Sequence, residues 1–136
     1  MSLDIQQREH EGIAILDLKG RITMGEEAGA LRAKVASLTA AGTINIIVNL
    51  AHVDYIDSTG LGAMVMCSTT VRKAGGNLKL ENLNRRNIEL LVMTKLATVF
   101  DLFTDEQDAV NSFFPDREIK HFDILTFVRE HQDKDE

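Results

Sequence analysis

Residues 49–76, NLAHVDYIDSTGLGAMVMCSTTVRKAGG, contain the junction that decides the fold of this chain. A strand-like apolar run leads to Asp57, and a helix-like run with Leu61, Met64 and Val71 on one side follows it. Between the two runs, the segment D-S-T-G-L-G brings an acid, two hydroxyls and two glycines to the expected helix start. A strand followed at once by a helix is typical of α/β proteins, so the junction predicts that fold class.

The alternation of strand and helix continues on both sides of the junction. Before it, the pattern predicts two short strands around Glu11-Gly12, a helix with the apolar stripe Ala28, Leu31, Val35 and Leu38, and a β-branched strand at 43–50. The nearly continuous apolar run of that strand is typical of a central strand covered on both faces. After the junction, strands are expected within 77–82 and 98–103, and helices within 84–96 and 104–113.

Several helix ends have recognisable caps. Gly42 follows the first helix and suits the left-handed conformation that often ends one. Asn84 is a candidate N-cap, and Thr104 and Gln107 have the spacing of a capping box. Because the first two strands look like a hairpin, we expect one mixed sheet in a single domain.

The composition excludes several classes of function. The chain has 136 residues, 44% hydrophobic and 26% charged, as in one soluble globular domain. No apolar run approaches the roughly 20 residues that span a membrane, and the N-terminus lacks the order of a secretory signal, so we expect a cytoplasmic protein. The net charge of −6 argues against direct binding of nucleic acid, which needs a basic face.

The cysteine and histidine content indicates no metal or redox site. Cys67 is the only cysteine, so it has no partner for an intrachain disulfide, and a buried helical position suits it. The four histidines, His10, His52, His121 and His131, do not share a metal-ligand spacing. We therefore expect no metal and no cofactor.

Residues 116–136 form a C-terminal extension beyond the predicted domain at 1–115. The apolar residues of this extension fit both a helix and a strand, and the charged end, HQDKDE, is expected to fray. They are Ile119, Phe122, Ile124, Leu125 and Val128. An apolar face here either packs on the core or serves association, which leaves a homodimer open.

The D-S-T-G-L-G segment has a purely structural interpretation. At a helix start, Ser58 or Thr59 can accept a hydrogen bond from a free backbone N–H group, and Asp57 favours the positive helix end. Gly60 and Gly62 each cost about 1 kcal/mol in helix propensity. The presence of both glycines despite this cost indicates that the helix needs a bare backbone on its outer side.

The same segment also admits several chemistries. Ser58 as a catalytic nucleophile lacks both a neighbouring base and a G-x-S-x-G context, so we expect no enzyme activity. A dinucleotide site would lack its third glycine and its tight turn, although Glu81 follows the next strand. An aspartyl-phosphate switch on Asp57 would need an acidic pair after the first strand, where Asp17 stands alone. The chemistry that remains is phosphorylation of Ser58 by another protein, since a helix start tolerates a phosphate.

The chain resembles the STAS family, specifically the bacterial anti-sigma factor antagonists, in four segments taken in order. These are LKGRIT at 18–23, INIIVNLAHVDYIDSTGLG at 44–62, GGNLKLENLN at 75–84 and TKLATVFDLFTDEQDAVNSF at 94–113. The resemblance covers residues 3–114, and D-S-T-G-L-G is its most specific part. It implies a single-layer mixed sheet with helices packed on one face, followed by the extension.

The resemblance implies a partner switch. The unphosphorylated form would bind an anti-sigma factor that is also a serine kinase using ATP, and would thereby free a sigma factor. Phosphorylation of Ser58 would end this binding, and a separate serine phosphatase would restore it. Asp57 carries over as the acidic neighbour, and Thr59, Gly60 and Gly62 carry over as contact surface around the serine. The chain would be a substrate and a binder without catalysis of its own.

Two alternatives stay open at the level of the sequence. STAS domains also serve in transporters, stress-sensing complexes and lipid-trafficking systems, and one could bind a nucleotide or other small ligand at the glycines. If Gly60 and Gly62 instead serve partner contact, replacing either by valine should weaken binding more than folding. The helix cost of valine itself is under about 1 kcal/mol.

Overall fold

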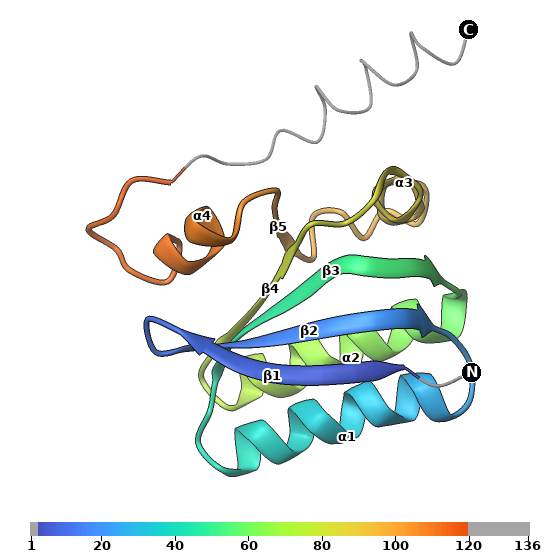
Figure 1. The fold of residues 1–136 in the computed structure, drawn as a ribbon, viewed down its shortest axis with the longest axis horizontal. Helices are drawn as coiled ribbons and strands as arrows, with labels where there is room; N and C mark the ends of the chain where they lie inside the picture. Colours follow the sequence, from blue (N-terminus) through green and yellow to red (C-terminus); the bar gives the residue numbers. More distant parts are fainter. Residues whose placement is uncertain (1–2, 120–136) are drawn as a thin grey trace, which may run out of the picture.

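The sheet runs in the order β1-β2-β3-β4-β5, and the computed structural model describes it within residues 3–119 (Figure 1). Its strands are β1 (Asp4–His10), β2 (Ile13–Ile22), β3 (Asn45–Ile56), β4 (Asn77–Glu81) and β5 (Asp101–Phe103). β1 is antiparallel to β2, and the other neighbouring pairs are parallel. The predicted hairpin and mixed sheet are therefore confirmed, with Glu11 and Gly12 at positive φ in the turn.

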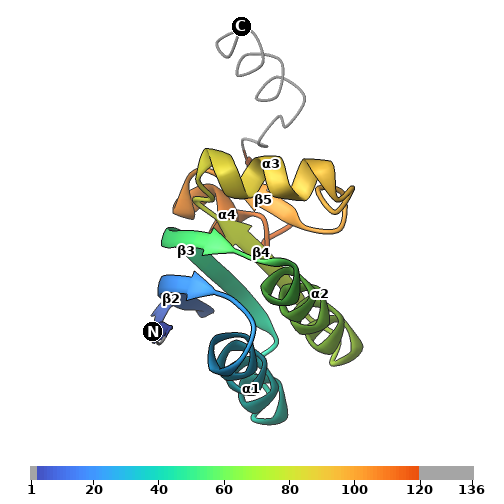
Figure 2. The same cartoon turned by 90° about the vertical axis from the view of Figure 1, so that its right-hand side faces the viewer.

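Four helices are described around this sheet: α1 (Glu26–Ala40), α2 (Ser58–Lys73), α3 (Arg85–Met93) and α4 (Glu106–Asn111). Figure 2 shows α1 and α2 side by side on one face of the sheet. The predicted stripe of α1 is buried there, and α2 contributes Leu61, Met64 and Val71 to the same core. Because both helices connect parallel strands, both begin at the edge where β2 and β3 end.

The opposite face of the sheet has a smaller apolar cluster that belongs to α4. Ile13, Ile15 and Ile47 point to this side, where Ala109 and Val110 cover them. Strand side chains alternate between the two faces, so the continuous apolar run of β3 supplies both clusters. Coverage on both faces of β3 is thus confirmed, and α4 adds a helix on the side opposite α1 and α2.

Two details near the end of the described chain differ from expectation. The cap of α4 is Asp105, whose Oδ2 accepts from the Asp108 N–H at 3.0 Å, so the predicted Thr104–Gln107 capping box is wrong. The predicted strand at 98–103 is shortened to Asp101–Phe103, because Val99 belongs to a turn that its N–H closes on the Leu96 carbonyl. The predicted cap Asn84 is confirmed by its bond from the Asn87 N–H at 2.8 Å.

Candidate functional site

The D-S-T-G-L-G segment lies at the edge of the sheet where β3 passes into α2. The Asp57 N–H donates to the Ile22 carbonyl of β2 at 3.2 Å, which continues the sheet by one residue. The next residue, Ser58, already begins α2. The junction therefore brings the end of β2, the end of β3 and the start of α2 together.

Asp57 is the N-cap of α2 and ties two segments together. Its Oδ1 accepts from the Gly60 N–H at 2.7 Å, and its Oδ2 accepts from the Met24 N–H at 3.0 Å. The first bond satisfies a free donor of the helix, and the second holds the loop between β2 and α1. Asp57 is thus a structural clamp, and the cap that Ser58 or Thr59 could have supplied is already made.

Ser58 and Thr59 are consequently free for other roles. Both side chains are exposed, and within residues 3–119 neither makes a side-chain hydrogen bond. Ser58 occupies the first position of α2, where the backbone N–H groups create a locally positive end. An exposed hydroxyl in such a place is accessible to a kinase.

The two glycines of the segment have different roles. Gly60 is buried, and a Cβ atom built on it would lie 1.8 Å from the backbone oxygen of Ile22. A Cβ on Gly62 would meet no atom within 4 Å. The expectation that both glycines affect contact more than folding is therefore wrong for Gly60, where backbone packing forbids any side chain. For Gly62 it remains a prediction.

Two exposed methionines flank the segment. Met24, in the loop that Asp57 clamps, is 73% exposed, and Met66, one turn beyond Gly62 on α2, is 52% exposed. The helical pattern contained the signal for Met66, since it lies off the buried stripe of Leu61 and Met64. Met24 stands in a loop, and nothing in its local sequence marks it as part of this surface.

The described residues offer little support for the other chemistries. Cys67 is buried, and desolvation raises the pKa of its thiol to about 11, which makes it a poor nucleophile. Between residues 3 and 119, no group of three or more histidine, cysteine or acidic side chains could hold a metal ion. No helix in that range is long and apolar enough to cross a membrane.

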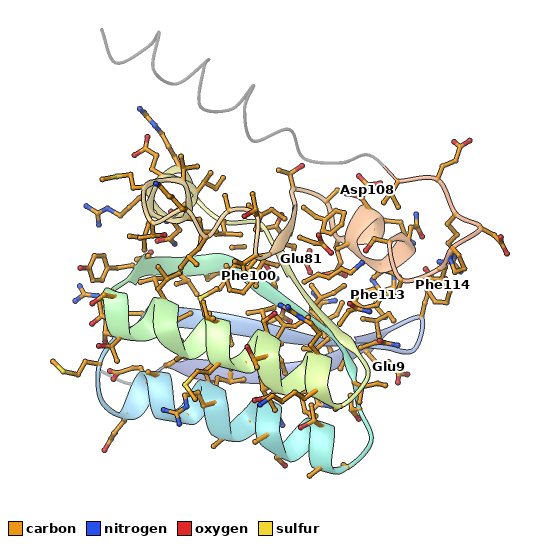
Figure 3. The ribbon with its side chains drawn as sticks, turned by 180° about the vertical axis from the view of Figure 1, so that it is seen from behind. Glu9, Glu81, Phe100, Asp108, Phe113 and Phe114 are labelled. Carbon is orange, nitrogen blue, oxygen red and sulfur yellow. The ribbon has the colours of Figure 1, made fainter. Side chains whose placement is uncertain are left out.

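Glu81, considered above for a dinucleotide site, lies on the other side of the sheet from α2. Its side chain is fully buried, and Figure 3 shows it on the side where α4 packs. Its Oε2 accepts from Asn82 at 3.2 Å, whereas its Oε1 has no donor among the described residues. Because α2 and its glycines face away from Glu81, the two do not form one nucleotide site.

Glu81 belongs to a polar network that sequence reasoning did not find. Arg8 of β1 donates to Asp17 of β2 at 2.6 Å and forms a two-pronged ion pair with Glu106 of α4. Burial and the neighbouring Glu106 raise the pKa of Glu81 to about 8, while Arg8 lowers the pKa of Glu106 to about 2. These shifts favour a protonated Glu81 beside an ionised Glu106.

With this geometry described, the comparison with known families gives one clear match. The model of the STAS domain matches residues 4–109. This chain is a STAS domain. The match includes the whole sheet and the D-S-T-G-L-G segment, and it ends within α4.

Among curated relatives, this STAS domain is similar to bacterial antagonists of anti-sigma factors. It is 34% identical over 110 residues to the anti-sigma-B factor antagonist of Bacillus subtilis, which covers 81% of this chain and 99% of the relative. It is 30% identical over 103 residues to the anti-sigma-B factor antagonist of Staphylococcus epidermidis, covering 75% and 85%. The chain thus spans most of the length of both relatives.

Solved structures confirm the fold of this STAS domain. A putative anti-sigma factor antagonist from Thermotoga maritima superposes with a TM-score of 0.74 at 21% identity, covering 79% of this chain and 92% of that one. The antagonist SpoIIAA superposes in its unphosphorylated and phosphorylated forms with TM-scores of 0.62 and 0.63. Those two matches are 19% and 18% identical, cover 82% and 81% of this chain, and each include 99% of SpoIIAA.

Proposed function

We propose that this STAS domain is an anti-sigma factor antagonist that Ser58 switches. In its unphosphorylated form it binds an anti-sigma factor, which is also a serine kinase, and so releases a sigma factor in the cytoplasm. The kinase transfers the phosphoryl group of ATP to Ser58, which ends the binding, and a serine phosphatase restores it. The chain is then a substrate and a binder, as the names of its curated relatives suggest.

The observation that carries this proposal is the free hydroxyl of Ser58 on a fixed backbone. Asp57 makes the helix cap, so the Ser58 oxygen can exchange its proton for the γ-phosphoryl group of ATP, with ADP leaving, without breaking a bond of the fold. Thr59 and Gly62 continue the exposed side of α2 beside it. This surface has little bulk, which suits close approach of a kinase active site.

A phosphate on Ser58 would change the surface while the interior stays as it is. It brings about two negative charges at pH 7, and the positive end of α2 accommodates them. Asp57 is already negative beside it, so the local charge becomes strongly acidic. A partner surface that fits a neutral hydroxyl must then desolvate or repel this charge, and its affinity falls.

Phosphorylation with the cognate kinase tests the assignment directly. Incubated with the anti-sigma factors of its source genome and ATP, the wild-type chain should gain one phosphate, which tandem mass spectrometry places on Ser58. Ser58→Ala should block the transfer, and Thr59→Ala, with the same chemistry one residue along, should leave it intact. A phosphate on Thr59 or Asp57 would overturn the assignment, as would the failure of every such kinase to modify the chain.

Binding measurements test the switch itself. Ser58→Ala should keep the affinity of the wild type, because it adds no charge and breaks no bond described above. Ser58→Glu should bind more weakly while its circular dichroism stays native, though less weakly than the true phosphoprotein, because a carboxylate brings only about one charge. Wild-type affinity in Ser58→Glu together with wild-type affinity in the phosphoprotein would refute the switch.

A further inference from the structure

A groove of about 430 Å³ separates α1 from α2 on the outer side of the molecule. Figure 2 shows the two helices side by side on one face of the sheet. The groove is lined mostly by small residues. The lining comes from Gly29, Ala33 and Ala36 of α1 and from Met66, Cys67 and Thr70 of α2. Gly29, Ala33 and Ala36 are exposed, whereas Cys67 is 2% exposed and forms the floor. The groove is therefore open because the side chains of α1 that line it are small, and larger side chains at these positions would fill it.

The groove is continuous with the surface around Ser58. α1 and α2 both begin at the edge of the sheet where β2 and β3 end, and so run in the same direction. On α2, Ser58, Gly62 and Met66 follow one another at intervals of four residues, which places them in one row along the helix. Met66 ends that row and is also a wall of the groove.

One charged side chain also lines the groove. Arg32 of α1 is exposed and lines the groove, where its positive charge partly opposes the rise that burial causes in the pKa of the Cys67 thiol. The chemistry of the groove is therefore apolar along its length, with a cation at its side.

We propose that this groove is a second docking site for the anti-sigma factor, which inserts an apolar side chain beside Met66 and a carboxylate beside Arg32. This inference rests on the proposed function and names the chemistry of the partner segment. Ser58 then controls one end of a longer interface, and the groove supplies affinity that phosphorylation does not alter. Apolar anchors in a pocket next to a charged pair commonly dominate such interfaces.

Methyl groups of methionine report on both ends of the interface. The chain has five methionines, of which Met24 and Met66 flank the proposed interface, Met64 is buried and Met93 is 81% exposed on α3. In full-length protein labelled with 13C-methyl methionine, the anti-sigma factor that phosphorylates Ser58 should shift the signals of Met24 and Met66. The Met93 signal should stay in place as the control for unspecific contact.

Filling the groove gives a matched pair of variants. Ala33→Leu adds bulk inside the groove, and Ala30→Leu adds the same atoms to an exposed position of α1 that does not line it. Ala33→Leu should weaken binding of that anti-sigma factor by about tenfold or more, with an unchanged unfolding midpoint, while Ala30→Leu binds as the wild type. Arg32→Gln should weaken binding and reduce its salt dependence, whereas Lys73→Gln at the end of α2 should not.

The outcomes separate this inference from the proposed function. If Ser58→Glu loses affinity while Ala33→Leu keeps it and Met66 does not shift, the groove is not part of the interface and the switch still stands. If no anti-sigma factor binds or modifies the wild-type chain, both proposals fail. If sedimentation shows a dimer of the isolated chain that Ala33→Leu dissociates, a second copy occupies the groove and the docking proposal is overturned.

Discussion

Gly60 and Gly62 lie two positions apart on the same helix, but they differ in the space that the surrounding backbone leaves for a side chain. The pro-Cβ direction of Gly60 points at the Ile22 carbonyl, which itself accepts from the Asp57 N–H. That of Gly62 points to open space. Sequence reasoning treated the pair alike, because local pattern contains no information on where the end of β2 passes. The distinction depends on a strand that lies more than thirty residues earlier in the chain.

Alanine at each glycine gives the first prediction. Gly60→Ala should destabilise the fold by at least about 2 kcal/mol, since a rigid backbone oxygen rather than a flexible side chain occupies the space. Gly62→Ala should be neutral or stabilise by up to about 1 kcal/mol, because alanine is the better helix former. Urea unfolding followed by circular dichroism measures both. Equal stability of the two variants would contradict the backbone contact.

Removal of the Asp57 clamp gives the second prediction. Asp57→Ala should lower the free energy of unfolding by about 1–2 kcal/mol, because the N–H groups of Gly60 and Met24 lose their acceptor. In amide hydrogen exchange, the N–H groups of Met24 and Gly60 should lose protection. The Asn87 N–H, which the Asn84 cap of α3 accepts, should keep its protection. Unchanged exchange at Met24 would show that the second bond does not form in solution.

At the scale of elements, α4 is attached to the sheet by charge as well as by apolar packing. Arg8 lies between Asp17 and Glu106, and His10 contacts Glu106 at 2.8 Å. Figure 3 shows Phe113 and Phe114 beside α4, where they complete the apolar cluster. On the same side of the sheet, burial and the neighbouring Glu106 raise the pKa of Glu81, so that it keeps a proton that an exposed glutamate would release. The attachment of α4 is therefore sensitive to pH.

The third prediction follows from the sign of the Glu81 shift. Its pKa of about 8 lies above that of an ordinary glutamate, so the folded state retains a proton that the unfolded chain has lost. Stability from this group is complete below about pH 4.5 and is lost as the pH rises through about 8. Glu106 works in the opposite direction, with stability that is lost as the pH falls toward about 2.

Urea unfolding at pH 6 and pH 9 measures this dependence. The wild type should lose more stability between these values than Glu81→Gln, because the amide of glutamine does not titrate in this range. Glu89→Gln, in an exposed ion pair with Arg85, serves as the control and should keep the wild-type slope. The same slope in Glu81→Gln and the wild type would exclude Glu81 as the source.

For the whole molecule, the periodic segments could be predicted and the long-range polar contacts could not. The stripe from Ala28 to Leu38 and the apolar run of β3 repeat with the period of their element, so sequence alone located them. The network of Arg8, Asp17 and Glu106 joins residues up to 98 positions apart. In its local sequence, each of these three residues has the pattern of an ordinary exposed charge. The junction at Ser58 lies between these cases, since its place was predicted and its clamp was not.

The fourth prediction concerns the C-terminal extension. Truncation after Pro115 should leave a cooperatively folded domain, because the family match ends at residue 109. The described contacts that it removes include those of Arg117 with the Glu11 carboxylate at 2.8 Å, the Asn111 side chain at 3.0 Å, the Phe114 carbonyl at 3.2 Å and the Phe114 ring. The ion pair lies on an exposed surface, where such pairs contribute little to stability. Thermal unfolding and sedimentation check this. A molten or insoluble product would assign 116–136 to the core.

The clamp at Asp57 also bears on how long the phosphorylated state lasts. Because its two bonds fix the start of α2 and the neighbouring loop, we expect phosphorylation of Ser58 to leave the backbone there in place. On the proposed function, the inactive state then differs from the active one by a single phosphate ester rather than by a second conformation. The inactive state lasts until that ester is hydrolysed. Its lifetime is set by the abundance of a phosphatase, which a cell can adjust without altering this protein.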